Sequence, residues 1–121
     1  MVSIGIDLVE IKRIRESMLR PGFLNKILGE FEYIELQNRK FKTQSVAANF
    51  CAKEAFLKAI GKGFGFCKLR DIEILRKLNG KPYLKLNGKA YRFQKENNLY
   101  FEISMTHTKD YASAVVVGYR K

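Results

Sequence analysis

The chain is poor in the residues that build disulfide frameworks, histidine metal centres and membrane spans. It has two cysteines and one histidine, and its 12 acidic residues are outnumbered by 23 lysines and arginines. Two cysteines and no charged-then-apolar leader are typical of a reduced cytosolic protein, so both cysteines are expected to pack rather than to form a disulfide or bind metal. One histidine cannot form a histidine-based metal cluster. No apolar run approaches the roughly 20 residues of a transmembrane helix.

What is present is a basic sequence of one domain's length. A net charge of +11 favours an anionic partner, and nucleic acid, an acidic protein or a phosphorylated small molecule would each satisfy it. At 121 residues the chain can bury a modest core. It contains no linker, internal repeat or low-complexity tract. We therefore expect a single domain over residues 1–121.

The segment from Val46 to Gly61 carries apolar residues on almost every side of a helix. Such a helix is normally buried, and a buried carboxylate must be paired, hydrogen-bonded or bound to a metal. Glu54 and Lys58 lie one turn apart within it. The same spacing is common in surface pairs that contribute about 0.2–0.5 kcal/mol. A catalytic role and an ordinary ion pair both remain open at this point.

A glycine-rich loop, Gly61-Lys62-Gly63-Phe64-Gly65, begins where this helix should stop. It combines a glycine C-cap with a backbone that a ligand can approach closely. A Walker loop places a phosphate at the positive N-terminus of a helix, whereas this loop follows the C-terminus, which repels anions. A phosphate here would need cations, and Lys58 and Lys62 are expected to lie over the loop and supply them.

The start of the chain has the two-residue period of a half-buried β-strand. Val2, Ile4 and Ile6 alternate with Ser3, Gly5 and Asp7. Asp7 shares a face with Gly5, whose missing side chain leaves room beside the carboxylate. Aspartate is a poor strand residue. Asp7 could therefore be an N-cap for a following helix or a functional carboxylate.

The remaining pattern predicts an α+β domain in which an antiparallel sheet packs on the long central helix. The Asn79-Gly80 pair between two apolar runs is a strong hairpin signal. We expect helices over residues 10–20, 23–28, 30–39 and 89–97, with the central helix capped by Thr43 or Ser45. We expect strands near residues 99–105 and 111–119, completing one sheet with the hairpin.

Three of these features together resemble the holo-[acyl-carrier-protein] synthases, the short single-domain branch of the 4′-phosphopantetheinyl transferases. They are Gly5-Ile6-Asp7 at the first strand, the hexapeptide from Lys53 to Lys58, and the glycine loop after it. The resemblance covers essentially the whole chain and includes Ser104-Met105-Thr106-His107, which is similar to the family's Ser-x-Ser/Thr-His stretch. It implies the 4′-phosphopantetheinyl transferase fold.

The family resemblance also implies an activity. 4′-Phosphopantetheine would pass from coenzyme A to a serine of apo acyl carrier protein, leaving adenosine 3′,5′-bisphosphate, in support of fatty acid biosynthesis. Asp7 and Glu54 would bind Mg²⁺ together with the coenzyme diphosphate, a ligand set that suits this ion. Lys58 would stabilise charge in the transition state. Glu54 would accept the serine proton directly or through a metal-bound water, and the sequence leaves both routes open.

Further contacts follow from the same resemblance. The residues expected to bind coenzyme A are Lys58, Gly61, Lys62, Gly63, Asn49, Thr106 and His107. Asn49 stands where many relatives have arginine, which leaves the contacts to the 3′-phosphate open. Thr106 and His107 would reach the nucleotide across a subunit boundary of a homotrimer, and the alternative for His107 is a hydrogen-bonded strand histidine. Lys12, Arg13 and Arg20 would dock the acidic carrier protein, although most basic helix faces are simply solvated.

Two rival functions use the same features. A small RNA-binding module would explain the charge and the aromatic residues among lysines in Tyr91-Arg92-Phe93-Gln94-Lys95. It would leave the two buried carboxylates, Asp7 and Glu54, without a purpose. A magnesium-dependent phosphohydrolase could use the same two carboxylates, and it would release phosphate without modifying a carrier protein.

Overall fold

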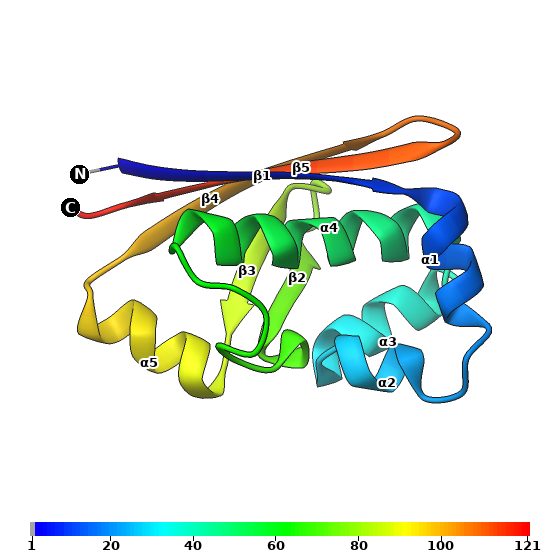
Figure 1. The fold of residues 1–121 in the computed structure, drawn as a ribbon, viewed down its shortest axis with the longest axis horizontal. Helices are drawn as coiled ribbons and strands as arrows, with labels where there is room; N and C mark the ends of the chain where they lie inside the picture. Colours follow the sequence, from blue (N-terminus) through cyan, green and yellow to red (C-terminus); the bar gives the residue numbers. More distant parts are fainter. Residues whose placement is uncertain (1) are drawn as a thin grey trace.

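A computed structural model describes residues 2–121 as an α+β fold of five helices, a 3-10 turn and five strands (Figure 1). The helices are α1 (Ile11–Met18), α2 (Phe23–Ile27), α3 (Glu30–Asn38), α4 (Thr43–Ala59) and α5 (Gly88–Glu96), with η1 at Leu69–Asp71. The strands are β1 (Val2–Glu10), β2 (Ile72–Arg76), β3 (Pro82–Leu86), β4 (Tyr100–His107) and β5 (Tyr111–Tyr119). Over this range, every helix is too short or too polar to cross a membrane.

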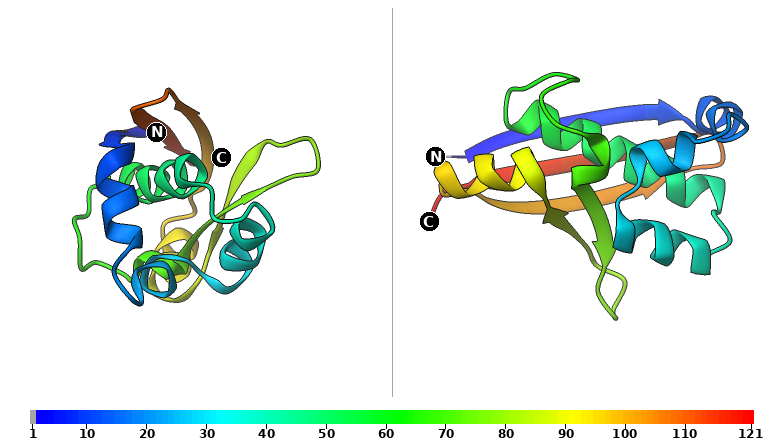
Figure 2. Two further views of the ribbon diagram at one scale, coloured as in Figure 1. Left: turned by 90° about the vertical axis from the view of Figure 1, so that its right-hand side faces the viewer. Right: turned by 90° about the horizontal axis from the view of Figure 1, so that it is seen from below.

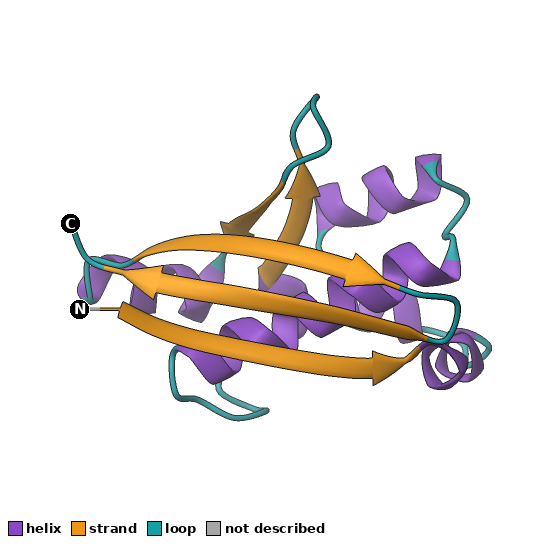
Figure 3. Cartoon of the chain, turned by 90° about the horizontal axis from the view of Figure 1, so that it is seen from above, coloured by secondary structure: helices purple, strands orange, loops and turns teal. Residues whose placement is uncertain are grey.

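The strands form two antiparallel sheets rather than one. The larger sheet has the order β1-β5-β4, and β2 and β3 form a separate hairpin. The expectation that the hairpin completes the same sheet is therefore wrong. Figure 3 shows the reason, since the hairpin runs at a steep angle to β4, where the backbones cannot keep a ladder. The Asn79-Gly80 turn itself is confirmed, with Gly80 at φ +89°.

Helix α4 lies along one face of the three-stranded sheet, as the sequence predicts (Figure 1). Its second half fills the core between that sheet and the hairpin, and Val46, Ala47 and Ala48 in its first half pack against α1, α2 and α3. Gly5 permits the close approach, because a Cβ there would lie 2.0 Å from the carbonyl oxygen of Ala55 and 2.5 Å from the amide nitrogen of Ala59. Strand β1 and helix α4 therefore meet backbone to backbone at Gly5.

The opposite face of the sheet is uncovered and apolar. Val2, Ile4, Ile6 and Leu8 are each more than 60% exposed, at 71%, 67%, 63% and 64%. The alternation in β1 thus places the apolar residues outward and Ser3, Gly5 and Asp7 towards α4. No helix or strand within residues 2–121 lies over this face (Figure 3).

A buried polar network ties α4 to α3 and the hairpin. The fully buried Lys53 donates to Glu32 Oε1 at 2.7 Å and to the carbonyls of Leu69 and Ile72. Burial raises the pKa of Glu32 and lowers that of Lys53, and their mutual attraction opposes both shifts. Glu73 accepts the amides of Phe31 and Glu32 at the start of α3. Lys53 is thus a structural neighbour of Glu54 with its own buried partners.

Candidate active site

Asp7 and one face of α4 come together beneath β1. Residues 51, 54, 55 and 58 recur at helical spacing on this face. Because Gly5 and Asp7 share the inward face of β1, the contact of Gly5 with Ala55 and Ala59 also brings Asp7 against α4. The structure therefore assembles Asp7, Glu54 and Lys58 from sequence positions about fifty residues apart.

Lys58 bridges the helix and the strand. Its ammonium nitrogen lies 3.2 Å from Asp7 Oδ1 and 3.0 Å from the carbonyl oxygen of Ile6. The Lys58 side chain is 58% exposed and that of Asp7 is 16% exposed, so the pair stands at the rim of the site. The expected position of Lys58 over the glycine loop is wrong, since the side chain turns back to the carboxylate.

Glu54 is the residue of this group whose pKa is shifted. Burial, followed by the negative charge of Asp7, raises its pKa to about 7, and Lys58 only partly offsets this. Two neighbouring carboxylates that repel one another are a natural site for a divalent cation. Within residues 2–121, no three histidine, cysteine, aspartate or glutamate side chains are placed to hold a metal ion together. Two carboxylates and open positions fit Mg²⁺, which commonly uses one or two carboxylates with substrate phosphates and water.

Cys51 is a contact of Asp7 that sequence analysis missed. Its sulfur lies 3.5 Å from Asp7 Oδ2 and 3.6 Å from the carbonyl oxygen of Ala112. Burial, and then the charge of Asp7, raises the pKa of the thiol to about 12, so it is protonated at neutral pH. The position of Cys51, one helical turn before Glu54 on the same face, was a signal that could have found it.

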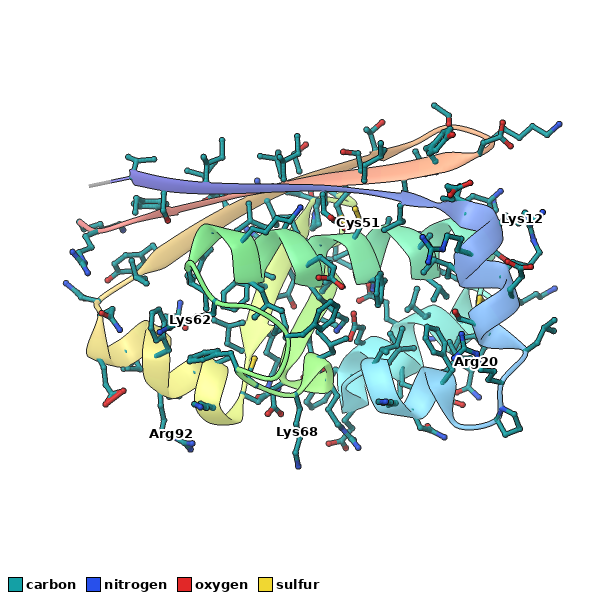
Figure 4. The ribbon with its side chains drawn as sticks, viewed as in Figure 1. Lys12, Arg20, Cys51, Lys62, Lys68 and Arg92 are labelled. Carbon is teal, nitrogen blue, oxygen red and sulfur yellow. The ribbon has the colours of Figure 1, made fainter. Side chains whose placement is uncertain are left out.

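The glycine loop has the expected C-cap. Gly61 has φ +73°, and the amide of Lys62 donates to the carbonyl of Leu57 at 2.9 Å, which closes the helix end. The Lys62 ammonium lies 5.4 Å from the ring centre of Phe66 and 5.7 Å from that of Phe93. Figure 4 shows Lys62 near the end of α4, on the side towards α5. Lys62 is therefore not brought to the Asp7 carboxylate.

Thr106 and His107 are exposed at the end of β4, across the sheet from Asp7. Strand β5 separates them from β1, with Thr106 paired to Ser113 and His107 to Ala112. Two strand spacings amount to about 10 Å. A single chain thus does not place these residues beside Glu54.

Asn49 is not on the surface, which corrects its assignment to the coenzyme. It is fully buried, and its amide nitrogen donates to Glu32 Oε2 at 3.0 Å and to the carbonyl of Ile74 at 3.2 Å. Its side-chain oxygen accepts a hydrogen bond from Arg76. The short amide turns inwards because the buried carboxylate of Glu32 needs a donor.

The basic residues expected on the first helix, Lys12, Arg13 and Arg20, are exposed on or beside α1, and each lines a cavity. One cavity of about 660 Å³ contains Glu54, Arg13, Phe50 and Phe64 in its wall. A second of about 520 Å³ shares both phenylalanines with the first and is bordered by Arg20. Figure 2 shows α1, α2 and α3 gathered at the end of the molecule away from α5. Lys12 lines a separate cavity near the β4–β5 turn.

The comparisons with known proteins agree with this geometry. Residues 3–116 match the family model of the 4′-phosphopantetheinyl transferase superfamily. A protein of Fusobacterium nucleatum named holo-[acyl-carrier-protein] synthase is 39% identical over 119 residues, covering 97% of this chain and 98% of the relative.

Solved structures give the same result. The Neisseria meningitidis holo-[acyl-carrier-protein] synthase superposes with a TM-score of 0.90 at 30% identity, over 99% of this chain and 100% of that chain. The Helicobacter pylori enzyme in complex with coenzyme A gives 0.83 at 31% identity, over 96% and 99%. With the carboxylate pair and the basic helix in the positions described, the chain belongs to the 4′-phosphopantetheinyl transferase superfamily.

Proposed function

We propose that this chain is a holo-[acyl-carrier-protein] synthase acting as one catalytic domain over residues 1–121. It transfers 4′-phosphopantetheine from coenzyme A to a serine of apo acyl carrier protein and releases adenosine 3′,5′-bisphosphate. The observation that supports this most directly is the convergence of Asp7, Glu54 and Lys58 in a chain whose relatives carry that name. The free thiols of Cys51 and Cys67 suit a reducing, cytoplasmic setting.

The carboxylates of Asp7 and Glu54 are the proposed Mg²⁺ ligands. When bound, the ion would neutralise charge on the diphosphate of coenzyme A. Lys58 is exposed enough to leave Asp7 and contact the same phosphates, where a positioned cation stabilises charge that develops during transfer. Mn²⁺ has the same preference for oxygen ligands, so it is a suitable probe of the site.

Glu54 is the proposed acceptor of the serine proton. Without metal its pKa is raised to about 7, near the neutral pH that suits a general base, and a bound cation would lower it. The serine oxygen attacks the phosphorus that carries pantetheine, and the bond to the adenosine-bearing phosphate breaks. Glu54 would take the proton directly or through an ordered water. The cavity beside Glu54, about 660 Å³ in volume, has room for the pantetheine arm and the serine loop.

The nucleotide end of coenzyme A is proposed to bind between subunits. Lys62 and the backbone of Gly61 and Gly63 would contact it from one chain, and Thr106 and His107 from a neighbour. The separation of the last two from Asp7 supports a contribution by another copy. The apolar outer face of β1 supports the same assembly, because monomeric proteins seldom expose such a patch.

A single charged substitution in this face tests whether the homotrimer forms through it. Ile6→Glu places a carboxylate in the apolar patch, and sedimentation should show monomers. Leu78→Glu is the matched control, because Leu78 is fully exposed at the tip of the hairpin, away from the sheet. A wild-type protein that sediments as a monomer at all concentrations would exclude the assembly.

The carrier protein is proposed to dock on α1. Lys12, Arg13 and Arg20 give this end a basic surface for an acidic partner, and the cavity of about 520 Å³ beside Arg20 offers an apolar recess. Exposed charges mainly affect the association rate and its salt dependence. Arg13→Glu should therefore lower kcat/KM for the carrier, whereas Arg92→Glu on α5, at the other end of the molecule, should not (Figure 4).

The decisive experiment combines the protein with coenzyme A, MgCl₂ and an apo carrier protein, followed by mass spectrometry of the carrier. We expect the mass of one phosphopantetheine group to be added, and EDTA or Asp7→Ala to abolish the addition. Release of phosphate with an unmodified carrier would favour the phosphohydrolase. Tight, salt-dependent RNA binding that survives Glu54→Ala, together with unmodified carriers, would favour the RNA-binding module.

A further inference from the structure

Within residues 2–121, three side chains form hydrogen bonds with Asp7, and they differ in which atom of Asp7 they hold. Ser113 donates its hydroxyl to the Asp7 backbone carbonyl at 2.9 Å, which fixes the main chain but not the carboxylate. Lys58 holds Oδ1 at 3.2 Å, and Cys51 approaches Oδ2 at 3.5 Å. Among the side chains of residues 2–121, Lys58 and Cys51 are therefore the two that hydrogen-bond to the carboxylate group itself.

Lys58 is a less fixed partner of Asp7, because its three N–H donors can be shared with a phosphate or turned towards it. Its side chain is 58% exposed, and the proposed function requires its ammonium group at the coenzyme phosphates. Cys51 has no exposed surface and packs in the core between α4 and the sheet, so its thiol cannot swing out to a substrate (Figure 4). Whether or not Lys58 shares its donors with the phosphates, the buried thiol remains in contact with the Asp7 carboxylate.

We propose that Cys51 is a positioning residue for the divalent metal site: it donates its S–H to Asp7 Oδ2 and so fixes the orientation of a carboxylate that would hold the ion. This inference rests on the proposed function. The thiol has one proton and two oxygen acceptors, Asp7 Oδ2 at 3.5 Å and the Ala112 carbonyl at 3.6 Å. A charged acceptor forms the stronger bond.

The size of the effect follows from comparable sites. Loss of a hydrogen-bond partner behind a metal ligand typically weakens metal binding about 10- to 100-fold. A thiol is a weak donor, so the lower end of that range applies. We expect Cys51→Ala to weaken Mn²⁺ binding about tenfold, and Cys51→Ser, which keeps a donor, to stay within about threefold of the wild type.

Mn²⁺ binding is measured by electron paramagnetic resonance on the protein without coenzyme A or carrier, so the result does not depend on transferase activity. In turnover, Cys51→Ala should raise the KM for Mg²⁺ and leave the KM for the carrier protein unchanged. A merely structural role would weaken both, or would affect the serine and alanine variants equally. Equal losses in the two variants would overturn the proposal.

A second measurement needs no metal and no active enzyme. In a Cys67→Ser background, Cys51 alone gives the S–H stretching band in the infrared spectrum, since the chain has two cysteines. Donation to a carboxylate lowers the frequency of this band, so the substitution Asp7→Asn should raise it. A band that keeps its frequency in the Asp7→Asn variant would show that the thiol donates elsewhere, and it would refute the assignment.

Discussion

Gly5→Ala should be the most damaging single-methyl substitution in the first strand. The added Cβ would lie 2.0 Å from the Ala55 carbonyl oxygen, 2.5 Å from the Ala59 amide nitrogen and 3.0 Å from Lys58 Cβ. Overpacking a core usually costs about 1–3 kcal/mol, because side chains can shift. Here two of the three neighbours are backbone atoms of a buried helix, so we expect a loss of at least about 3 kcal/mol.

Urea unfolding followed by circular dichroism measures this loss directly. Gly63→Ala is the matched control, because a Cβ at Gly63 would have no neighbour within 4 Å, and its free energy of unfolding should stay within about 1 kcal/mol of the wild type. Relief of the clash requires β1 to move away from α4, which separates Asp7 from Lys58. A Gly5→Ala protein as stable as the control would refute the described contact between strand and helix.

Two other residues give predictions that depend on charge. Glu54 has a raised pKa of about 7 against a reference of 4.5, so the folded state binds more protons between these values and loses stability as pH rises through them. As the pH rises from 4.5 to 8 without metal, the free energy of unfolding of Glu54→Gln should therefore increase by about 1–2 kcal/mol relative to that of the wild type. This is less than the full pKa shift implies, because water screens this half-buried group. If the unfolding free energies of the two proteins changed with pH in parallel, the prediction would be contradicted. Lys53→Met should lower the free energy of unfolding by about 3–5 kcal/mol, because it leaves the buried Glu32 carboxylate without its cation. The double variant Lys53→Met/Glu32→Gln should lose less stability in thermal unfolding, because it buries no unpaired charge.

The parts of the site that lie in one element were predictable from the sequence. An apolar pattern around α4 signals burial, so Glu54 and Lys58 stood out as charged residues on a buried helix. The Gly61 C-cap and the Gly80 turn were predictable because their positive φ angles favour glycine. These features depend on local backbone geometry, which a short stretch of sequence encodes.

Features that depend on the packing of distant elements were not predictable in the same way. Alternation in β1 shows two faces but not which one a helix covers, and the apolar face proved to be the exposed one. The alternative of Asp7 as an N-cap is wrong, because β1 continues to Glu10, which itself occupies the N-cap position of α1. Asn49 was misassigned because its partner Glu32 comes from another helix.

If subunits associate through the uncovered outer face of β1, as proposed, the protein's stability and activity should depend on its concentration. Where association buries such a face, subunit dissociation on dilution returns it to water, and both the melting temperature and the specific activity fall together. An enzyme that also borrows Thr106 and His107 from a neighbour would lose coenzyme affinity in the same step. Nanomolar assays would then report a weaker catalyst than the crowded cell contains.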